Sequence, residues 1–464
     1  MRNLELLRPI SLFKIIREEY TLLHNKLVRA SVLLLNGKVL RLNETASDIL
    51  SLCDGEHNIR EICESLANEY EETYNRVLKG TLSFLKQGYE AGFITFDESY
   101  KKVCKYKKLN MSLTDILHEP LKNYLYSPEK VYFEVSSKCN LKCSHCYFYP
   151  HSGKEDLSLD EIRKLSDELE RLGVFSIALG GGEPLLREDI VEIVKQFCNK
   201  NLFVTLATNG TMLSESLAEE LWKVGLRSIQ FSLDGVEEVH NNIRGQDVFK
   251  KVQEAIKLAK IVGFNVGIKM TIQKNNAESI RNVYLISKNL CCESFSFNRV
   301  IPAGRAKALF DVIHVPSSQY DVLLKQFDEF YEKDRDLCKP QVTHDDIIHF
   351  RENSCSEEDF GCPAGRTSIS ISPDGAIKPC SYFPSNFTCG NIREKSLQEI
   401  WLYSDLLLQL RRIKRADLWE PCKSCKLICN GGCRGAATAY FGSLYAPDPL
   451  CTVVENSVKK HGGA

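Results

Sequence analysis

Three cysteines with uneven spacing carry the strongest chemical signal in this sequence. Cys139, Cys143 and Cys146 lie in the run CNLKCSHC, just after the apolar, β-rich stretch 131–135. A four-iron cluster takes four ligands, so three thiolates leave one iron free to hold a substrate or cofactor and to do chemistry on it. A closed site of four cysteines would only store electrons or stabilise structure. The spacing therefore predicts an open iron–sulfur cluster.

A zinc site with His145 as the fourth ligand is the alternative for the same cysteines. His145 directly precedes Cys146, which makes it awkward to close a tetrahedron around one ion. Zinc motifs also usually pair two short Cys-x2-Cys hooks. We therefore favour the iron–sulfur interpretation.

Composition limits the class of protein. The chain has 464 residues, of which 43% are hydrophobic and 26% charged, as expected for a globular protein of two or three domains. A net charge of −1 argues against general attraction to nucleic acid or to an anionic membrane. The N-terminus has no charged-then-apolar signal pattern, and no run approaches the roughly 20 apolar residues of a membrane span. We expect a cytoplasmic protein with neither nucleic acid nor membrane as a partner.

Nineteen cysteines are more than a cytoplasmic protein of this size needs for packing. Disulfides are disfavoured in a reducing compartment, so the surplus indicates metal binding, above all in the cysteine-dense last 120 residues. Eight cysteines are interpreted instead as small core or surface residues. These are Cys53, Cys63, Cys104, Cys198, Cys291, Cys292, Cys338 and Cys389.

Residues 1–100 form the first predicted unit, with a winged-helix-like order of elements. A hairpin with the turn Asn36-Gly37, three helices and a short strand are predicted over residues 32–42, 44–53, 58–70, 74–89 and 92–96. A DNA reader of this shape should be basic, but acidic residues outnumber basic ones here, so DNA binding is disfavoured. Residues 101–130 are polar and rich in lysine, which indicates a linker.

A repeating strand–helix pattern follows the linker. Apolar strands are predicted near Val131, Ser176, Leu202, Ser228, Asn265 and Ser294, and helices from near Ser158, Arg187, Ser214, Val248, Ala277 and Ser317. Six β–α units predict an α/β fold with a parallel sheet, most simply an open, partial barrel. Active sites of such folds lie at the carboxyl ends of the strands. Cys139, Glu183, Asn209, Ser232 and Arg299 fall at or just beyond these ends.

Short motifs recur at these strand ends. Gly180-Gly181-Gly182-Glu183-Pro184 follows the second strand, Thr208-Asn209-Gly210 the third and Ser232-Leu233-Asp234-Gly235 the fourth, with Arg244 beyond. Glycines alone would indicate only a turn. A carboxylate such as that of Glu183, however, can accept hydrogen bonds from the ammonium group of a bound amino acid.

With these motifs in this order, and with Tyr147 after the third cysteine, the chain resembles the radical S-adenosylmethionine (SAM) superfamily. The resemblance implies that the cluster reductively cleaves SAM to a 5′-deoxyadenosyl radical that abstracts hydrogen. It implies that Glu183 holds the methionine moiety of SAM and that Arg244 pairs with its carboxylate. The SAM-binding residues that it predicts are Gly181, Gly182, Glu183, Asn209, Ser232 and Arg244.

The C-terminal cysteines resemble the SPASM extension found on radical SAM enzymes that modify peptides. The extension implies two auxiliary [4Fe-4S] clusters, hence three clusters in total. By the family's pattern the first would be held by Cys362, Cys380 and Cys433, with Cys355 a possible fourth ligand, and the second by Cys422, Cys425, Cys429 and Cys451. Without Cys355 the first cluster would be open and could bind a substrate thiolate. Three residues separate Cys425 from Cys429 where five are usual, which puts the local geometry in doubt.

The first unit also has a family resemblance. Leu42-Asn43-Glu44-Thr45-Ala46, Cys53-Asp54-Gly55, Ile62 and Leu66 resemble the small peptide-chaperone protein of pyrroloquinoline quinone biosynthesis. Such domains recognise the leader of a ribosomally made precursor peptide, and a hairpin edge can accept an added strand. A purely structural appendage is the alternative.

Together the resemblances imply four regions: a leader-recognition domain (1–100), a linker (101–130), a radical SAM partial (β/α)6 barrel (131–345) and a SPASM iron–sulfur domain (346–464). The run from Ile371-Ser372-Pro373-Asp374-Gly375 to Gly390-Asn391-Ile392 looks most like the thioether-forming maturases of sactipeptides and ranthipeptides. The implied reaction joins a cysteine sulfur to a carbon of the peptide. The implied partners are the precursor peptide and a flavodoxin or ferredoxin-type reductant, with an auxiliary cluster accepting an electron.

Other functions remain open at this stage. A carbon–carbon crosslink, another radical modification of a peptide, or sulfatase-type maturation would use the same barrel. An electron-transfer protein would not need the SAM motifs, and an iron–sulfur DNA regulator would need a DNA-binding first unit. The general base is unassigned, because Lys269, Arg299 and Arg305 near the strand ends are as well explained as surface or salt-bridging residues.

Overall fold

The computed structural model describes residues 10–11, 15–23, 26–35, 38–90, 94–96, 127–149, 155–200, 202–334, 336, 340–344, 362–425, 429 and 431–455. The chain divides into two compact units, Met1–Tyr126 and Ser127–Ala464. Predictions for the turn Asn36-Gly37, for Cys104, Cys338 and Cys355 and for most of the linker lie outside the described residues. None of the described helices is both long and apolar enough to cross a membrane.

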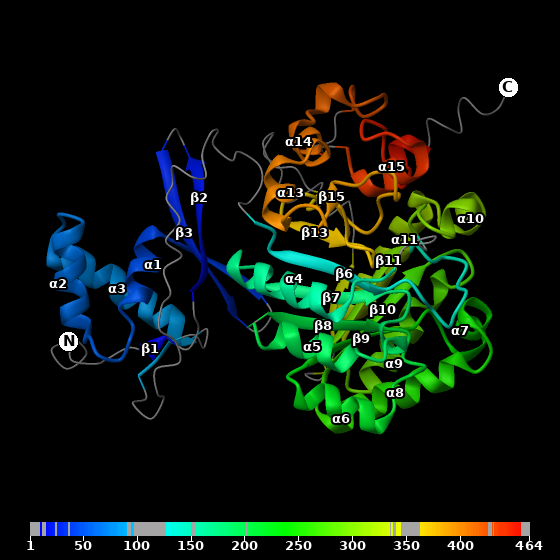
Figure 1. The fold of residues 1–464 in the computed structure, drawn as a ribbon, viewed down its shortest axis with the longest axis horizontal. Coiled ribbons are helices and arrows are strands. Elements are labelled where there is room, and N and C mark those ends of the chain that lie inside the picture. The colour runs from blue at the N-terminus through cyan, green and yellow to red at the C-terminus, as the bar shows by residue number, and fades with distance from the viewer. Residues whose placement is uncertain are drawn as a thin grey trace. The chain divides into compact units, whose positions relative to one another are not determined.

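The first unit contains the predicted hairpin, helices and closing strand, together with two strands that the sequence did not predict. Its elements are β1 (Ile10–Ser11), β2 (Ile15–Leu23), β3 (Lys26–Leu35), β4 (Lys38–Asn43), α1 (Glu44–Ser51), α2 (Ile59–Glu69), α3 (Tyr74–Glu90) and β5 (Ile94–Thr95). Strands β2, β3 and β4 form an antiparallel sheet in that order, and β1 pairs with β5 (Figure 1). The additional strands are β1 and β2.

Local capping and burial explain the helices of this unit. The Asn43 side chain accepts a hydrogen bond from the Ala46 amide at the start of α1 (2.9 Å). Asn58 and Glu61 form a capping box at the start of α2. Helix α2 then buries Ile62 and Cys63 completely. Cys63 is thus a core residue, as predicted.

The second unit is built on one mixed sheet. Its strands are β6 (Lys130–Ser136), β7 (Ser176–Gly181), β8 (Phe203–Thr208), β9 (Ser228–Ser232), β10 (Asn265–Ile272), β11 (Ser294–Arg299), β12 (Gln341–His344), β13 (Ser368–Ile371), β14 (Ala376–Lys378) and β15 (Gly390–Asn391). Among the described residues the sheet has ten strands, in the order β12-β11-β10-β9-β8-β7-β6-β13-β14-β15. Strands β6 to β11 pair in parallel as neighbours, which confirms the predicted run of six β–α units.

Helices cover the apolar face of these parallel strands (Figure 1). They are α4 (Leu159–Arg171), α5 (Ile190–Cys198), α6 (Glu215–Lys223), α8 (Val248–Val262), α9 (Ile280–Asn289) and α11 (Ser317–Lys333), with the short turns η3 (Pro184–Leu186) and η4 (Ala277–Ser279). Two further helices, α7 (Glu237–Arg244) and α10 (Ala306–Ile313), lie outside this core, and α10 packs in a smaller cluster with Leu450. Alternate strand residues such as Phe133, Leu179 and Phe231 join the helices in one core. The positions between them carry small or polar side chains, among them Glu134, Gln230 and Asn298. The second face of the sheet is therefore polar.

The C-terminal region adds strands to the same sheet rather than building a separate one. Strand β13 pairs in parallel with β6, with Ile371 opposite Phe133, and β14 pairs antiparallel with β13. Helices α13 (Leu397–Tyr403), α14 (Asp405–Arg412) and α15 (Arg434–Phe441) and the turn η5 (Arg415–Asp417) follow. The boundary predicted between residues 345 and 346 remains a prediction, and hydrogen-bonded pairing runs across it.

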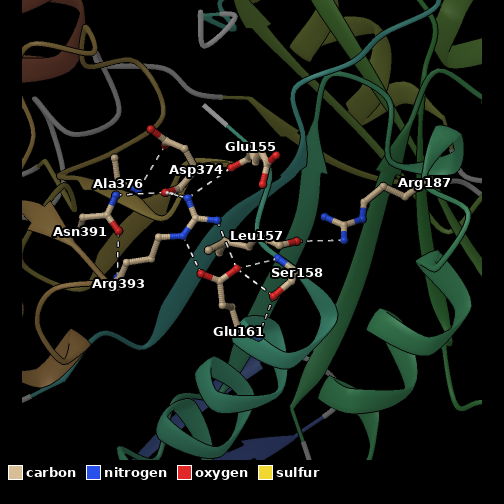
Figure 2. A network of polar contacts seen from close by, with 9 residues as sticks. All are labelled: Glu155, Leu157, Ser158, Glu161, Arg187, Asp374, Ala376, Asn391 and Arg393. Carbon is tan, nitrogen blue, oxygen red and sulfur yellow. Dashed lines mark hydrogen bonds and ion pairs between the residues drawn. The ribbon is translucent and has the colours of Figure 1, made fainter. Parts of the chain in front are cut away.

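A polar network ties the C-terminal strands to the start of α4 (Figure 2). Arg393 donates to both carboxylate oxygens of Glu161, at 2.6 and 3.2 Å, and also to the Asp374 carbonyl. Glu161 is at the same time the capping-box partner of Ser158. The hydrogen bond from Arg393 outweighs the opposing effect of burial, and with the contribution of Ser158 it lowers the pKa of Glu161 to about 2.

We expect Glu161→Gln to destabilise the second unit by about 1 kcal/mol at pH 7, because a partly exposed, two-point ion pair and a cap are weakened together. A carboxylate whose pKa is lowered stabilises the fold above its ordinary pKa of 4.5 and loses that contribution as the pH falls toward 2. The difference in unfolding temperature between the wild type and this variant, measured by calorimetry, should therefore shrink from pH 7 to pH 3. Glu219→Gln, in an exposed pair with Lys223, is the control and should change little. A pH-independent difference would contradict the assignment.

Candidate functional site

The three spaced cysteines lie on the loop that leaves the carboxyl end of β6. Cys139 is exposed, Cys143 is buried and Cys146 is intermediate. Burial raises the pKa of Cys143, and the charges of Cys146 and Cys139 raise it further. Burial and the charge of Cys146 likewise raise the pKa of Cys139. The structure thus brings the three thiols close enough to interact electrostatically, as an open cluster site requires.

The backbone of the cysteine loop accepts hydrogen bonds from residues that follow two other strands. The amides of Gly182 and Glu183 donate to the carbonyls of Ser136 and Lys138, at 2.8 and 2.7 Å. On the other side, the side-chain Nε of Arg305 donates to the Cys143 carbonyl (3.1 Å). The backbone amide of its neighbour Ala306 donates to the Cys146 carbonyl (3.2 Å). The glycine motif is therefore part of the support of the cysteine loop, and Arg305 is a supporting residue whose role the sequence left open.

The Glu183 carboxylate is fixed in orientation before any ligand binds. It is 1% exposed and accepts hydrogen bonds from the Thr208 hydroxyl (2.6 Å), the Asn209 amide (2.8 Å) and the Leu185 amide (3.1 Å). Burial raises the pKa of Glu183, and these three hydrogen bonds oppose that shift. Two oxygens offer about four acceptor positions, so capacity for a further donor remains. This arrangement suits an ammonium ligand.

Asn209 connects the third strand end to the cysteine loop. Its side-chain Nδ2 donates to the side-chain Oδ1 of Asn140 (2.9 Å), one residue after Cys139. Ser232 lies one strand further on, at the end of β9, in register with Lys269 of β10. Gly181 has a φ of +117°, and an added Cβ there would lie 2.7 Å from the Ser136 carbonyl oxygen. The predicted residues thus occupy adjacent strand ends.

Arg244 is already bound to Asp234. Its Nε donates to Asp234 Oδ2 at 2.6 Å, and its two terminal nitrogens lie 4.0 Å from Cys143 Sγ and 3.4 Å from His145 Nε2. Burial alone would raise the pKa of Asp234, but Arg244 and two nearby histidines lower it to about 2. Asp234 therefore stays ionised, and it fixes the guanidinium beside the cysteine loop. Arg244 can still use its terminal nitrogens for a carboxylate ligand.

His145 belongs to the same network. His145 is 6% exposed, its Nε2 lies 3.5 Å from Asp234 Oδ2, and burial lowers its pKa to about 4. The ring is thus a neutral partner of the Asp234–Arg244 pair. Asp234 is the residue that sequence reasoning missed, and its position in the Ser232-Leu233-Asp234-Gly235 motif was the available signal.

The C-terminal cysteines separate into a set of three and a set of four. Burial raises the pKa of Cys433 strongly, and Cys362 and Cys380 add to this effect. Burial likewise raises the pKa of Cys422 to about 11, and the charges of Cys425, Cys429 and Cys451 add to this effect. That second set lines one pocket, formed by Cys422, Cys425, Cys429 and Cys451 with Pro421, Val453 and Val454. These are the two groups expected from the sequence, except that Cys355 lies outside the described residues.

The donors present, groups of cysteine thiols, fit iron–sulfur clusters. Within the described part of the chain, no three His, Cys, Asp or Glu side chains are placed to hold one metal ion. A four-iron cluster is a larger body that takes its thiolates at separate corners, and the thiols gather in groups of three, three and four. The individual ligand assignments remain predictions.

Comparison with known families agrees with this architecture. The model of the radical SAM superfamily matches residues 133–285, that of the SPASM iron–sulfur cluster-binding domain residues 362–426, and that of coenzyme PQQ synthesis protein D (PqqD) residues 20–94. The resemblances to the radical SAM superfamily, the SPASM extension and the PqqD-like domain are confirmed. Radical SAM and SPASM domains bring [4Fe-4S] clusters and SAM as cofactors.

Individual relatives are similar over most of the chain. The antilisterial bacteriocin subtilosin biosynthesis protein AlbA of Bacillus subtilis is 32% identical over 333 residues, which are 70% of each chain. The AdoMet-dependent heme synthase of Methanosarcina barkeri is 29% identical over 344 residues, 70% of this chain and 96% of the relative. The crystal structure of Streptococcus suis SuiB bound to precursor peptide SuiA matches with a TM-score of 0.69 at 18% identity, covering 95% of this chain and 100% of that one. The last likeness establishes the fold.

We expect Gly182→Ala to prevent assembly of the cluster at Cys139, Cys143 and Cys146. An added Cβ would lie 2.1 Å from the Lys138 carbonyl oxygen and 3.2 Å from the Cys139 amide nitrogen, so the cysteine loop must move. Gly180→Ala, two residues earlier, is the matched control, because its Cβ would meet only Ala207 at 3.9 Å. Iron content and SAM-dependent spectral changes of the reconstituted proteins measure the effect. Equal loss in both variants, or in neither, would contradict this account of the loop.

Proposed function

Because the chain belongs to the radical SAM superfamily and carries a SPASM extension and a PqqD-like domain, we propose that it matures a ribosomally made peptide by forming an intramolecular thioether. The bond would join a cysteine sulfur to a carbon of the same peptide. The proposal rests above all on the separation of the C-terminal thiols into a set of three and a set of four.

A set of three thiols leaves a cluster position for a further ligand. Cys362, Cys380 and Cys433 form such a set, and a cysteine of the peptide has the chemistry of the missing ligand. Cys355 is the competing ligand within the chain. In the proposal the peptide thiol is held there while a carbon of the same peptide reaches the barrel, where the SAM motifs lie.

The chain's own residues prepare the SAM site. Glu183 accepts the ammonium of SAM, since its carboxylate is already oriented by Thr208 and Asn209. Arg244, held by Asp234, offers its terminal nitrogens to the carboxylate of SAM. Gly181 and Gly182 let the backbone approach closely, and Asn209 and Ser232 complete the site. When bound, SAM and the open cluster supply a radical that removes one hydrogen atom from the peptide carbon.

Formation of the thioether is a two-electron oxidation of the peptide. One hydrogen atom leaves the carbon, one proton leaves the cysteine thiol, and one electron leaves as the carbon–sulfur bond forms. The peptide therefore loses two hydrogen atoms for each crosslink. An auxiliary cluster is the electron acceptor in this proposal, and a flavodoxin or ferredoxin-type protein supplies the electron that begins each cycle.

The PqqD-like unit is proposed to bind the leader of the precursor peptide. Its sheet order β2-β3-β4 leaves β2 and β4 as edge strands within the described residues, and an extended segment can add to such an edge. SuiB, whose fold this chain shares, was crystallised with a precursor peptide. A role of this unit in recognition accounts for its presence better than a structural role alone.

We expect the reconstituted enzyme, with SAM, reductant and a cysteine-containing precursor peptide, to lower the peptide mass by two hydrogen atoms for each crosslink. Fragmentation should place the bond on cysteine sulfur, and thiol alkylation should fail at that cysteine. The triple variant Cys139→Ala, Cys143→Ala, Cys146→Ala should give neither product nor 5′-deoxyadenosine. If fragmentation instead places the crosslink between two carbons, the enzyme forms a carbon–carbon bond and the thioether proposal is wrong. Turnover of a porphyrin or of a sulfatase peptide, without any modification of a precursor, would overturn the proposal.

We further expect Glu183→Gln to weaken SAM binding by about 10- to 100-fold, because a buried charge-assisted hydrogen bond to the ammonium is worth roughly 1.5–3 kcal/mol. Equilibrium binding of SAM to the anaerobically reconstituted protein measures the loss. Glu192→Gln, on the surface of α5, is the control. Unchanged affinity in Glu183→Gln would remove this residue from the SAM site.

A further inference from the structure

A buried ion pair connects the barrel to the strand that precedes Cys380. Glu134 of β6 is 3% exposed and Lys378 of β14 is 1% exposed, and Lys378 Nζ lies 3.6 Å from Glu134 Oε2. Strand β13 separates the two strands in the sheet, with Ile371 paired to both Phe133 and Ile377. The pair therefore spans one intervening strand on the polar face of the sheet.

The pair is poorly satisfied for its depth. A separation of 3.6 Å is longer than a hydrogen bond, and among the described residues both oxygens of Glu134 and the Lys378 nitrogen have no hydrogen-bond partner. Buried charges of this kind cost more than a well-packed apolar pair of the same volume. Stability alone therefore gives no reason for them, whereas buried polar groups without hydrogen-bond partners do occur in proteins where they serve redox chemistry.

The position of the pair relates it to two of the cysteine groups. Lys378 lies two residues before Cys380, and its charge opposes the effect of burial, which raises the pKa of the Cys380 thiol to about 12. Glu134 pairs in register with Gly180, and its charge adds to burial in raising the pKa of Tyr147, next to Cys146. The two loops themselves meet, because the rings of Tyr147 and Tyr382 pack edge to face at 5.3 Å. The pair thus lies where the two loops meet, and Lys378 Nζ also lies 5.9 Å from the centre of the Tyr149 ring, on the open-cluster loop.

We propose that Lys378 and Glu134 set the reduction potential of the first auxiliary cluster, with Lys378 as its fixed positive charge and Glu134 as the group that holds and partly offsets that charge. The proposal rests on the ligation proposed above for Cys362, Cys380 and Cys433. Reduction adds negative charge to a cluster, so a cation held nearby in a medium of low dielectric favours the reduced form. Lys378 therefore raises the potential and makes this cluster the better electron acceptor. Burial keeps salt from screening the effect.

Opposite charge removals must then have opposite effects. Lys378→Met removes the cation and should make the cluster potential more negative, whether Glu134 stays ionised or takes up a proton. Glu134→Gln leaves the cation without its counter-charge and should make the potential more positive. The double variant should return toward the wild type, and Lys378→Arg, which keeps the charge, should change the potential least. A structural role alone would not produce this pattern of signs.

The test is a redox titration followed by electron paramagnetic resonance, on full-length reconstituted enzyme without SAM and without peptide. The signal of the first auxiliary cluster is the one altered by Cys380→Ser, and the cluster at Cys422, Cys425, Cys429 and Cys451 serves as an internal reference that should not move. Lys395→Met, which removes an exposed lysine paired with Glu399, is the matched control and should leave the potential unchanged.

Three results would overturn the proposal: no signal that depends on Cys380, no shift in Lys378→Met, or shifts of the same sign in both single variants. Because no peptide is present, an enzyme that makes no thioether can still pass this test, and a thioether-forming enzyme can still fail it. If the proposal holds and the peptide is a substrate, Lys378→Met should also lower the crosslinked product formed per 5′-deoxyadenosine released.

Discussion

Strand β6 pairs with β7 on one side and with β13 on the other, and both cysteine-rich regions depend on these two parallel ladders. The ladder with β7 brings Gly182 and Glu183 against the backbone that leads into Cys139. The ladder with β13 fixes the hairpin that ends at Cys380. One strand thus sets the distance between the open cluster site and the first auxiliary set. A change in its register would reverse the apolar and polar faces at the same time.

Buried charge gives these sites their orientation. Asp234 remains ionised because Arg244 lies beside it, and Glu183 is held by three donors although burial alone disfavours its charged form. Burial also raises the pKa of the Cys143 and Cys380 thiols, so in the ligation proposed for them these thiols would lose their protons as iron binds. Assembly of the clusters is therefore coupled to proton release. The free-energy cost of burying these charged side chains is therefore already present in the protein without its cofactors.

The sequence predicted what short-range patterns encode. Period-2 and period-3.6 hydrophobicity located β6 to β11 and their helices, and motifs at the strand ends located Glu183 and Asn209. Contacts between residues far apart in the chain leave no such pattern. Three such contacts are the pairing of β13 with β6, the hydrogen bond from Arg244 to Asp234 and the ion pair of Lys378 with Glu134. Strand β2 was missed for a different reason. The turn Asn36-Gly37 was fully explained by a hairpin of two strands, so it gave no indication of a third.

The two auxiliary sets are not equivalent in their relation to the barrel. The set of Cys362, Cys380 and Cys433 follows strands of the main sheet, and its loop touches the open-cluster loop through Tyr382 and Tyr147. The set of four lies in the turn-rich segment near the end of the chain and lines its own pocket. Charge beside the first set therefore lies close to the loop of the open-cluster site, where the proposed reaction would release an electron. The buried pair of Glu134 and Lys378 lies at this junction, so the proposed electron transfer would give this costly arrangement of charges a reason.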